Sequence, residues 1–250
     1  MKITVHHQAE TFQVDLSRPL DISIPLNNRS PQVKCFYAPD VEMSPLVAGD
    51  FIGSIEKGSP VNFYNLKINP HGNGTHTECN GHISSDFRTI NQSLKQFHFI
   101  AELKTVTPRS LDNGDSIIDE TCLDLKGLNS EALIIRSLPN KENKLVHDYS
   151  GTNPSYLDYR LVEQLVDLGV QHLLLDLPSV DREQDEGKLL AHKAFWKNCN
   201  AERQSCTITE LIYVPSQVDD GRYLLNLQIC SLEMDASPSK PVLYRLEIEE

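Results

Sequence analysis

The chain contains 250 residues, of which 23% are charged, and its formal net charge is −12. A chain of this length can bury one sizeable core, and α/β architectures of this size commonly form one domain, so we expect a single domain over residues 1–250. It contains no run of Lys and Arg and no apolar stretch of ~20 residues, which argues against nucleic-acid and membrane partners and leaves a small-molecule substrate.

The N-terminal segment predicts short strands. Residues 12–16 and 20–26 alternate apolar with polar side chains, and Ser17-Arg18-Pro19 interrupts them, a pattern typical of a half-buried sheet. The residues before them, 1–7, lack the apolar core of a signal peptide. We therefore expect a cytoplasmic protein.

Residues 32–64 are rich in proline, glycine and aromatic side chains and show no clean period. The segment is interpreted either as a long loop over a pocket or as irregular structure at a sheet edge. Its aromatic side chains are the candidates to line a substrate pocket: Phe36, Tyr37, Phe63 and Tyr64.

Residues 69–82 contain most of the side chains that can bind a metal. His71, His76 and His82 fall within twelve consecutive positions, and Glu78 lies two residues after His76. Imidazole nitrogens and carboxylate oxygens are natural ligands of zinc and manganese, and the glycines of the segment permit the sharp turns that a site requires. The segment could also be a glycine-rich surface loop with solvated histidines. The spacing favours a metal-dependent hydrolytic site.

If the chain is extended after Gly74, His76 and Glu78 point to one side, and Thr77 and Cys79 point to the other. Cys79 is then either a buried residue or a nucleophile activated by the nearby His82. The six cysteines form no Cys-x-x-Cys pair, so we expect most of them to be reduced and structural.

The middle of the chain has an α/β pattern. Residues 132–136 read as a strand, and residues 157–168 place leucines at helical spacing before Gly169, which is a typical helix end. Residues 170–177 form an apolar run typical of a strand that is covered on both faces. His172 within this run is interpreted as a packed or hydrogen-bonded histidine.

The polar residues after this strand allow two interpretations. Asp176 and Asp181 could orient a metal-bound histidine, or they could cap the loop, because aspartate is also a common turn residue. The charged run at 181–186 is more typical of a solvated loop than of a functional patch.

Several separated segments resemble one family, the metal-dependent cyclase-like hydrolases, which include bacterial kynurenine formamidase and isatin hydrolase. Gly74-Thr75-His76, Glu78 and His82 match the intervals of the family motif His-x-Gly-Thr-His-x-Asp-x-Pro-x-His. Further similar segments follow along the chain in the family's order: Asp15-Leu16-Ser17, residues 176–181, Ala191-His192-Lys193 and residues 207–211.

Three positions depart from the motif. Gly72 stands where the family has its first histidine, with His71 displaced by one position, Glu78 replaces an aspartate, and Asn80 replaces a proline. A shift of one residue moves a side chain to the opposite face of a regular strand, so His71 reaches the site only if the backbone is irregular here. His192 lies in a sequence that could also be a plain helix face next to Trp196.

The resemblance implies an α/β fold, the swivelling β/β/α domain with a mixed and antiparallel β core and outer helices, assembled as a homodimer or homotetramer. It also implies hydrolysis of a C–N bond in a small amide, an aryl formamide or a cyclic amide, with one or two divalent ions, Zn²⁺ or Mn²⁺. The expected metal ligands are His71, His76, Glu78, His192 and Glu210. His82 is the expected general base and acid, since histidine changes charge nearest to neutral pH.

Two other functions remain open. A metal-dependent cyclase or lyase would use the same polarised carbonyl for proton abstraction and would leave solvent oxygen out of the product. A non-catalytic small-molecule binder on the same fold is the second, because Gly72 and Asn80 depart from the motif.

Overall fold

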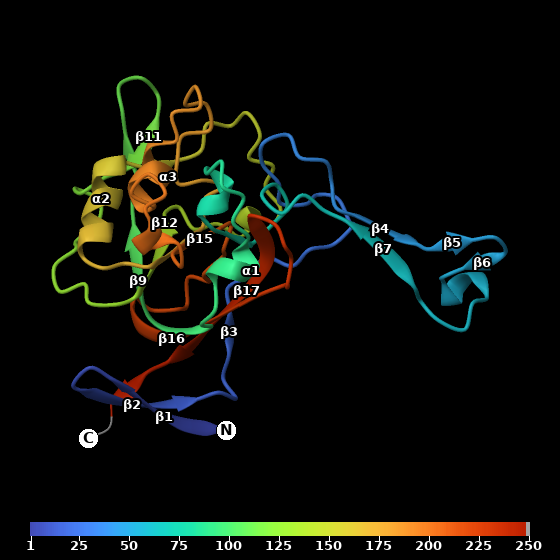
Figure 1. Ribbon diagram of the computed structural model, residues 1–250, viewed down its shortest axis with the longest axis horizontal. Helices are drawn as coiled ribbons and strands as arrows, with labels where there is room; N and C mark the ends of the chain where they lie inside the picture. Colours follow the sequence, from blue (N-terminus) through green and yellow to red (C-terminus); the bar gives the residue numbers. More distant parts are fainter. Residues whose placement is uncertain (249–250) are drawn as a thin grey trace.

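A sheet that closes on itself forms the centre of the protein (Figure 1). The computed structural model describes residues 1–248. The strands at residues 98–106, 132–137, 172–175 and 207–210 run parallel to one another, and the other neighbours in the barrel are antiparallel. The barrel order is β16 (Gly221–Ile229), β9 (His98–Val106), β12 (Ala132–Ser137), β14 (His172–Leu175), β15 (Thr207–Glu210), β8 (His76–Glu78) and β17 (Ala236–Arg245), which pairs back onto β16. This architecture confirms the predicted mixed β core.

Apolar side chains pack on both faces of the parallel strands. Along β12, Ile134 belongs to the cluster inside the barrel, whereas Leu133 and Ile135 belong to the cluster under the outer helices. Burial on both faces explains why these strands are nearly continuous apolar runs. The outer layer consists of α2 (Tyr159–Asp167) and α3 (Leu190–Phe195).

Helix α2 begins two residues later than predicted, because Asp158 accepts a hydrogen bond from the backbone of Arg160 and so caps its first turn. Gly169 ends the helix in the left-handed region, as expected. His172 is fully packed: its Nδ1 lies 2.9 Å from Thr207 Oγ1 and its ring centroid 3.9 Å from that of Phe99. It is therefore a core histidine, as predicted.

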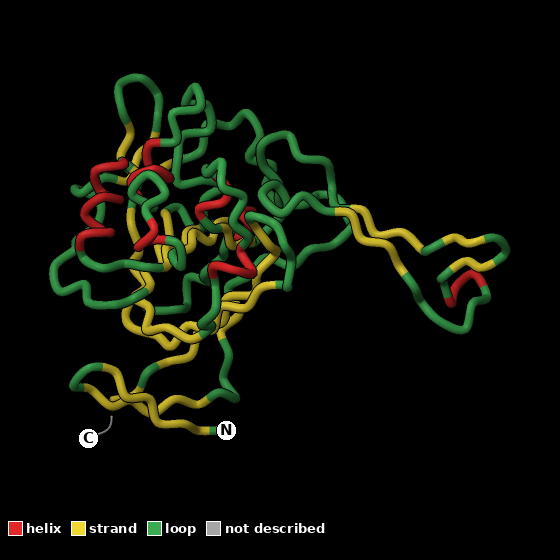
Figure 2. The backbone as a smooth tube through the Cα atoms, viewed as in Figure 1, coloured by secondary structure: helices red, strands yellow, loops and turns green. Residues whose placement is uncertain are grey.

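The N-terminal strands form a small separate sheet beside the barrel (Figure 2). β1 (Lys2–His7) and β2 (Glu10–Asp15) pair with β18 (Glu247–Ile248), and β3 (Leu20–Asp21) pairs with β17. The second predicted strand is much shorter than residues 20–26. The Thr75 hydroxyl accepts the hydrogen bond of the Ile24 N–H, and Pro25 has no N–H to donate, so no ladder continues there.

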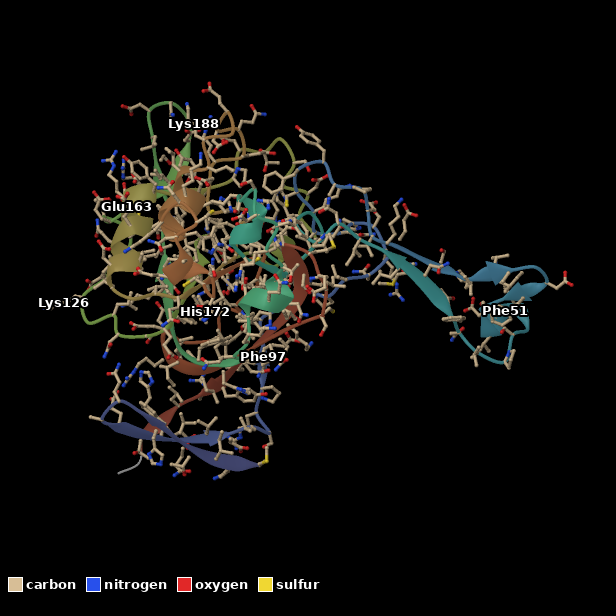
Figure 3. The ribbon with its side chains drawn as sticks, viewed as in Figure 1. Phe51, Phe97, Lys126, Glu163, His172 and Lys188 are labelled. Carbon is tan, nitrogen blue, oxygen red and sulfur yellow. The ribbon has the colours of Figure 1, made fainter. Side chains whose placement is uncertain are left out.

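Residues 42–67 form an arm that extends away from the barrel (Figures 1 and 2). The prediction of a pocket loop or irregular edge structure was wrong for this part, because β4 (Glu42–Pro45) pairs with β7 (Tyr64–Lys67), and β5 (Val47–Ala48) with β6 (Phe51–Ile52). Figure 3 places Phe51 near the outer end of the arm, far from His172 in the body. The outer end of the arm therefore lies away from the barrel, and the aromatic side chains of Phe63 and Tyr64 are exposed.

The remaining elements are short. None of the helices in the described part of the chain is long and apolar enough to cross a membrane. These elements are η1 (Ile55–Lys57), η2 (Asn80–His82), α1 (Ile90–Ser93), β10 (Arg109–Ser110), β11 (Ser116–Ile118), η3 (Glu142–Leu145), β13 (Tyr156–Leu157) and η4 (Ala201–Arg203).

Candidate metal centre

Strand β8 presents its acidic and imidazole side chains on the outer face of the barrel. In the β8–β15 pairing, His76 lies opposite Glu210 and Glu78 lies opposite Ile208, which packs in the cluster under the helices. The Thr77 hydroxyl on the other face lies 2.8 Å from that of Thr209. The predicted alternation along this strand is therefore confirmed.

Cys79 points away from this cluster, into the barrel interior. Its thiol donates a hydrogen bond to the Arg88 carbonyl at 3.3 Å, and burial raises its pKa. A nucleophile needs an accessible thiolate, so the alternative that assigned this role to Cys79 is wrong.

His192 reaches the cluster from helix α3. Its Nε2 lies 3.0 Å from Glu78 Oε1, and its Nδ1 lies 2.6 Å from Asp181 Oδ2. The Asp181 carboxylate also accepts the backbone N–H groups of Ala191 and His192 at the start of the helix. Asp181 thus orients the His192 ring and also caps the start of helix α3.

Glu210 and His76 lie side by side at the ends of their strands. Glu210 Oε2 is 3.3 Å from His76 Nε2, and Glu210 Oε1 accepts the Val180 N–H at 3.0 Å. His76 Nδ1 lies 3.0 Å from the Gly74 carbonyl. Both side chains are almost completely buried, so their orientations are fixed by packing.

The displaced histidine also reaches the cluster. A Cβ at Gly72 would lie 2.2 Å from Ala38 Cβ, so a side chain does not fit where the motif has its first histidine. The backbone turns at Asn69, which accepts from the N–H groups of Gly72 and Asn73, and this turn directs His71 inward. His71 Nδ1 lies 3.2 Å from Glu78 Oε2.

His82 stands at the accessible side of the cluster, on η2. Its Nε2 lies 3.8 Å from Glu78 Oε2, its ring centroid lies 4.2 Å from that of His71, and 31% of its side chain is exposed. Gly81 is required beside it, because a Cβ there would lie 1.9 Å from the Arg88 carbonyl oxygen. All six residues expected from the sequence therefore lie in one connected cluster, which Glu210 joins through His76.

One residue of the cluster was not anticipated. Asp235 Oδ2 lies 2.9 Å from His71 Nε2 and 3.2 Å from His82 Nδ1, and these hydrogen bonds hold the pKa of the carboxyl well below its usual value. It precedes β17, which pairs with β8. The segment around Asp235 carries no motif, so the sequence offered no signal for it.

The charges of the cluster depend on one another. Burial alone would raise the pKa of Glu78, but His82 and His192 hold it well below its usual value. Burial would lower the pKa of His71, but the hydrogen bond to Asp235 and the adjacent Glu78 carboxylate outweigh it and raise the pKa to about 10. Burial would also lower the pKa of His192, but the charge of Glu78 and the hydrogen bonds to Asp181 and Glu78 outweigh it and raise the pKa. Protons on the rings thus compensate the buried carboxylates.

The cluster meets the requirements of a divalent metal ion. His76 Nε2 and Glu78 Oε2 are buried and make no hydrogen bond, although they lie 3.3 Å from Glu210 Oε2 and 3.2 Å from His71 Nδ1, respectively. Ligand atoms lie within 4.8 Å of one another in three overlapping groups that draw on His71, His76, Glu78, His82, His192 and Asp235. Nitrogen and oxygen ligands of this kind suit zinc or manganese.

The family model described as "Putative cyclase" matches residues 14–182. The chain belongs to this cyclase family. No curated protein matches the chain in sequence. The match includes the residues from His71 to His82 and also Asp181, whereas His192, Glu210 and Asp235 of this cyclase-family chain lie beyond it.

Solved structures show the same fold. A protein described as a predicted metal-dependent hydrolase from Bacillus stearothermophilus is 16% identical, with 91% of this chain and 98% of that chain covered and a TM-score of 0.61. Isatin hydrolase A from Ralstonia solanacearum is 12% identical, with 91% of each chain covered and a TM-score of 0.64. Isatin hydrolase A from Labrenzia aggregata is 11% identical, with coverages of 92% and 94% and a TM-score of 0.63.

In this cyclase-family chain, Asp176 lies away from the histidines of the cluster and has a structural role. It accepts the Ser137 N–H at 3.0 Å and pairs with Lys144 Nζ at 2.7 Å. Burial raises its pKa, and the lysine compensates its charge. The interpretation that Asp176 orients a metal-bound histidine is therefore wrong.

Proposed function

We propose that this cyclase-family protein is a metal-dependent hydrolase that cleaves the C–N bond of a small amide, an aryl formamide or a cyclic amide. One observation carries the proposal: His76 Nε2 and Glu78 Oε2 are buried, make no hydrogen bond and are surrounded by further imidazoles and carboxylates. Similarity of fold to isatin hydrolases, one of which is bound to the product analogue thioisatinate, supports the choice of substrate class.

The residues divide into ligands and a proton carrier. His71, His76 and Glu78 would hold one ion, Zn²⁺ or Mn²⁺, and His192 and Glu210 would complete that site or hold a second ion. A bound ion would polarise a carbonyl and lower the pKa of a bound water from ~16 to ~7.

His82 is the proposed general base and acid. Its Nδ1 donates to Asp235, so Nε2 is the ring nitrogen left to take a proton from water and to return it to the leaving nitrogen. Part of its ring is exposed, which gives a substrate access, while Glu78 behind it is shielded from solvent. Asp181 holds His192 in one orientation and keeps that side of the cluster closed.

The proposal also includes the cellular compartment and the partners. All six cysteines are unpaired, which suits a reducing compartment, and we place the reaction in the cytoplasm. The partners are a small-molecule substrate and further copies of the chain in a homodimer or homotetramer.

The first test is the metal content of the purified untagged protein, without chelators, for wild type, Glu78→Gln and the control Glu163→Gln, whose carboxylate is exposed on α2. We expect stoichiometric zinc or manganese in wild type and Glu163→Gln and its loss in Glu78→Gln. A wild-type protein that takes up neither ion on reconstitution contradicts the proposal.

The second test is a screen of formamides and cyclic amides in ¹⁸O-labelled water. Hydrolysis places one solvent oxygen in the acid product. Turnover without label would indicate the cyclase or lyase, and bound metal without turnover would indicate the non-catalytic binder.

A further inference from the structure

Each histidine of the metal centre has one ring nitrogen held by an acceptor and the other directed at a carboxylate. Gly74 O holds His76 Nδ1, and Asp181 holds His192 Nδ1. The other nitrogens of these two rings face Glu210 and Glu78, respectively. In a metal site, the acceptor behind the ring determines which nitrogen remains available to the ion.

The two remaining rings, His71 and His82, share a single acceptor. Asp235 Oδ2 lies 2.9 Å from His71 Nε2 and 3.2 Å from His82 Nδ1. Their other nitrogens, His71 Nδ1 and His82 Nε2, lie 3.2 and 3.8 Å from the same oxygen of Glu78. The two rings are therefore fixed between the same pair of carboxylates.

We infer that Asp235 is a positioning residue that directs both the displaced ligand His71 and the base His82 toward the metal centre. The inference rests on the proposed function, because it assigns a role within that site. In this role Asp235 does not bind the substrate and acts only through the two rings.

The exposure of the rings explains why an acceptor is needed here. His71 and His82 have 24% and 31% of their side chains exposed, whereas His76 and His192 are almost fully buried. Packing holds the buried rings, but partly exposed side chains retain rotamer freedom unless a hydrogen bond restricts it. Asp235 supplies that restriction to both exposed rings.

The displaced position of His71 adds a second reason. Gly72 has no space for a side chain, so the first ligand must come from position 71, on an irregular turn rather than on a strand. Asp235 itself is fixed relative to β8, because its carbonyl accepts the Cys79 N–H at 3.0 Å. The carboxylate thus connects the irregular turn to the strand that carries His76 and Glu78.

The experiment uses the full-length protein and four forms: wild type, Asp235→Ala, Asp235→Asn and the control Glu233→Gln. Glu233 lies in the same segment but its carboxylate binds Thr89 and Asn91, not a histidine. The first readout is the imidazole ¹H–¹⁵N NMR spectrum of the metal-free protein. We expect protected low-field protons on His71 Nε2 and His82 Nδ1 in wild type and in Glu233→Gln, and their loss in Asp235→Ala.

The second readout is the affinity for Zn²⁺, measured by competition with a chelator. Loss of an outer hydrogen-bond partner of a metal-binding histidine typically weakens binding by ~10–100-fold, which we expect for Asp235→Ala. Asp235→Asn keeps an oxygen but loses the charge, so its protons should shift to higher field and its affinity should fall between those of wild type and Asp235→Ala.

The outcomes separate the two proposals. Zinc binding within twofold of wild type in Asp235→Ala, or unchanged spectra and affinity in Asp235→Asn, overturns the positioning role while the metal centre stands. If wild type binds no zinc, the proposed function fails, and the metal-free spectra still decide the inference: ring protons lost in Asp235→Ala support it, and unchanged protons overturn it.

Discussion

Glu78 shows how much one side chain contributes to this site. One of its oxygens faces His192 and the other faces His71 and His82, so a single carboxylate contacts histidines from three parts of the chain. The family motif has the shorter aspartate at this position. The extra methylene lets the carboxylate reach these rings from a fully buried strand.

His82→Ala separates catalysis from metal binding. Loss of a general base typically slows turnover by ~10²–10⁴-fold, and bound metal should stay near the wild-type amount because the expected ligands remain. Turnover on a responsive amide and metal content by elemental analysis are the measurements, with exposed His6→Ala as control. Loss of metal in His82→Ala would place His82 among the ligands instead.

His172 predicts a pH dependence of stability. Burial, with a smaller contribution from Arg203, lowers its pKa to about 3, whereas the ring titrates near ~6.5 in the unfolded chain. Between these values the unfolded chain binds the proton and the folded protein does not. Its contribution to stability is therefore complete above pH ~6.5 and is lost as the pH falls toward 3.

His172→Gln tests this dependence. Denaturant titrations at pH 7 and 4.5 should show the free energy of unfolding of wild type decreasing by ~2–3 kcal/mol relative to the variant, since each pKa unit corresponds to ~1.4 kcal/mol. Parallel pH profiles of the two proteins would show that the pKa of His172 is the same in the folded and unfolded states, which contradicts this prediction.

At the scale of elements, helix α3 depends on a carboxylate from a preceding loop. Leu189 precedes the helix in the left-handed region and provides no side-chain cap, and Asp181 accepts the N–H groups of Ala191 and His192 instead. The loop thus sets both the start of the helix and the orientation of the histidine that it carries.

Asp181→Ala should lower the free energy of unfolding by ~1–2 kcal/mol through loss of this cap and weaken zinc binding by ~10–100-fold through His192. Asp185→Ala is the matched control, because Asp185 accepts the Leu189 N–H in the same loop without contact to His192. Thermal denaturation and zinc competition are the measurements. Equal zinc affinities of the two variants would contradict the orienting role of Asp181.

At the scale of the whole molecule, the arm carries apolar side chains that a single copy of the chain leaves exposed. A two-stranded ribbon alone is marginally stable, and several large apolar side chains of the arm are exposed. A second copy can cover the same patch twice in a twofold arrangement, and stable interfaces bury ~1,200–2,000 Å² in total. The exposed side chains are Val47, Phe51, Ile55, Val61, Phe63, Tyr64 and Leu66.

We therefore expect wild type to be a dimer or tetramer and the double variant Phe63→Ser, Leu66→Ser to have the mass of one 28.2 kDa chain. Lys67→Ser, at an exposed polar position of the same arm, should keep the wild-type mass. Light scattering coupled to size exclusion measures both. A monomeric wild type contradicts the assembly.

The sequence by itself determined the ligand chemistry, the alternation along residues 76–79, and the helix and buried strands of the α/β part. Each of these depends on periodicity or on side-chain chemistry within a few residues. Tertiary structure decided the direction of the arm, the inward turn of His71 and the position of Asp235, which lies 153 positions from His82 along the chain. Such contacts arise only when the register of β17 on β8 is fixed, and that register is set by closure of the whole barrel.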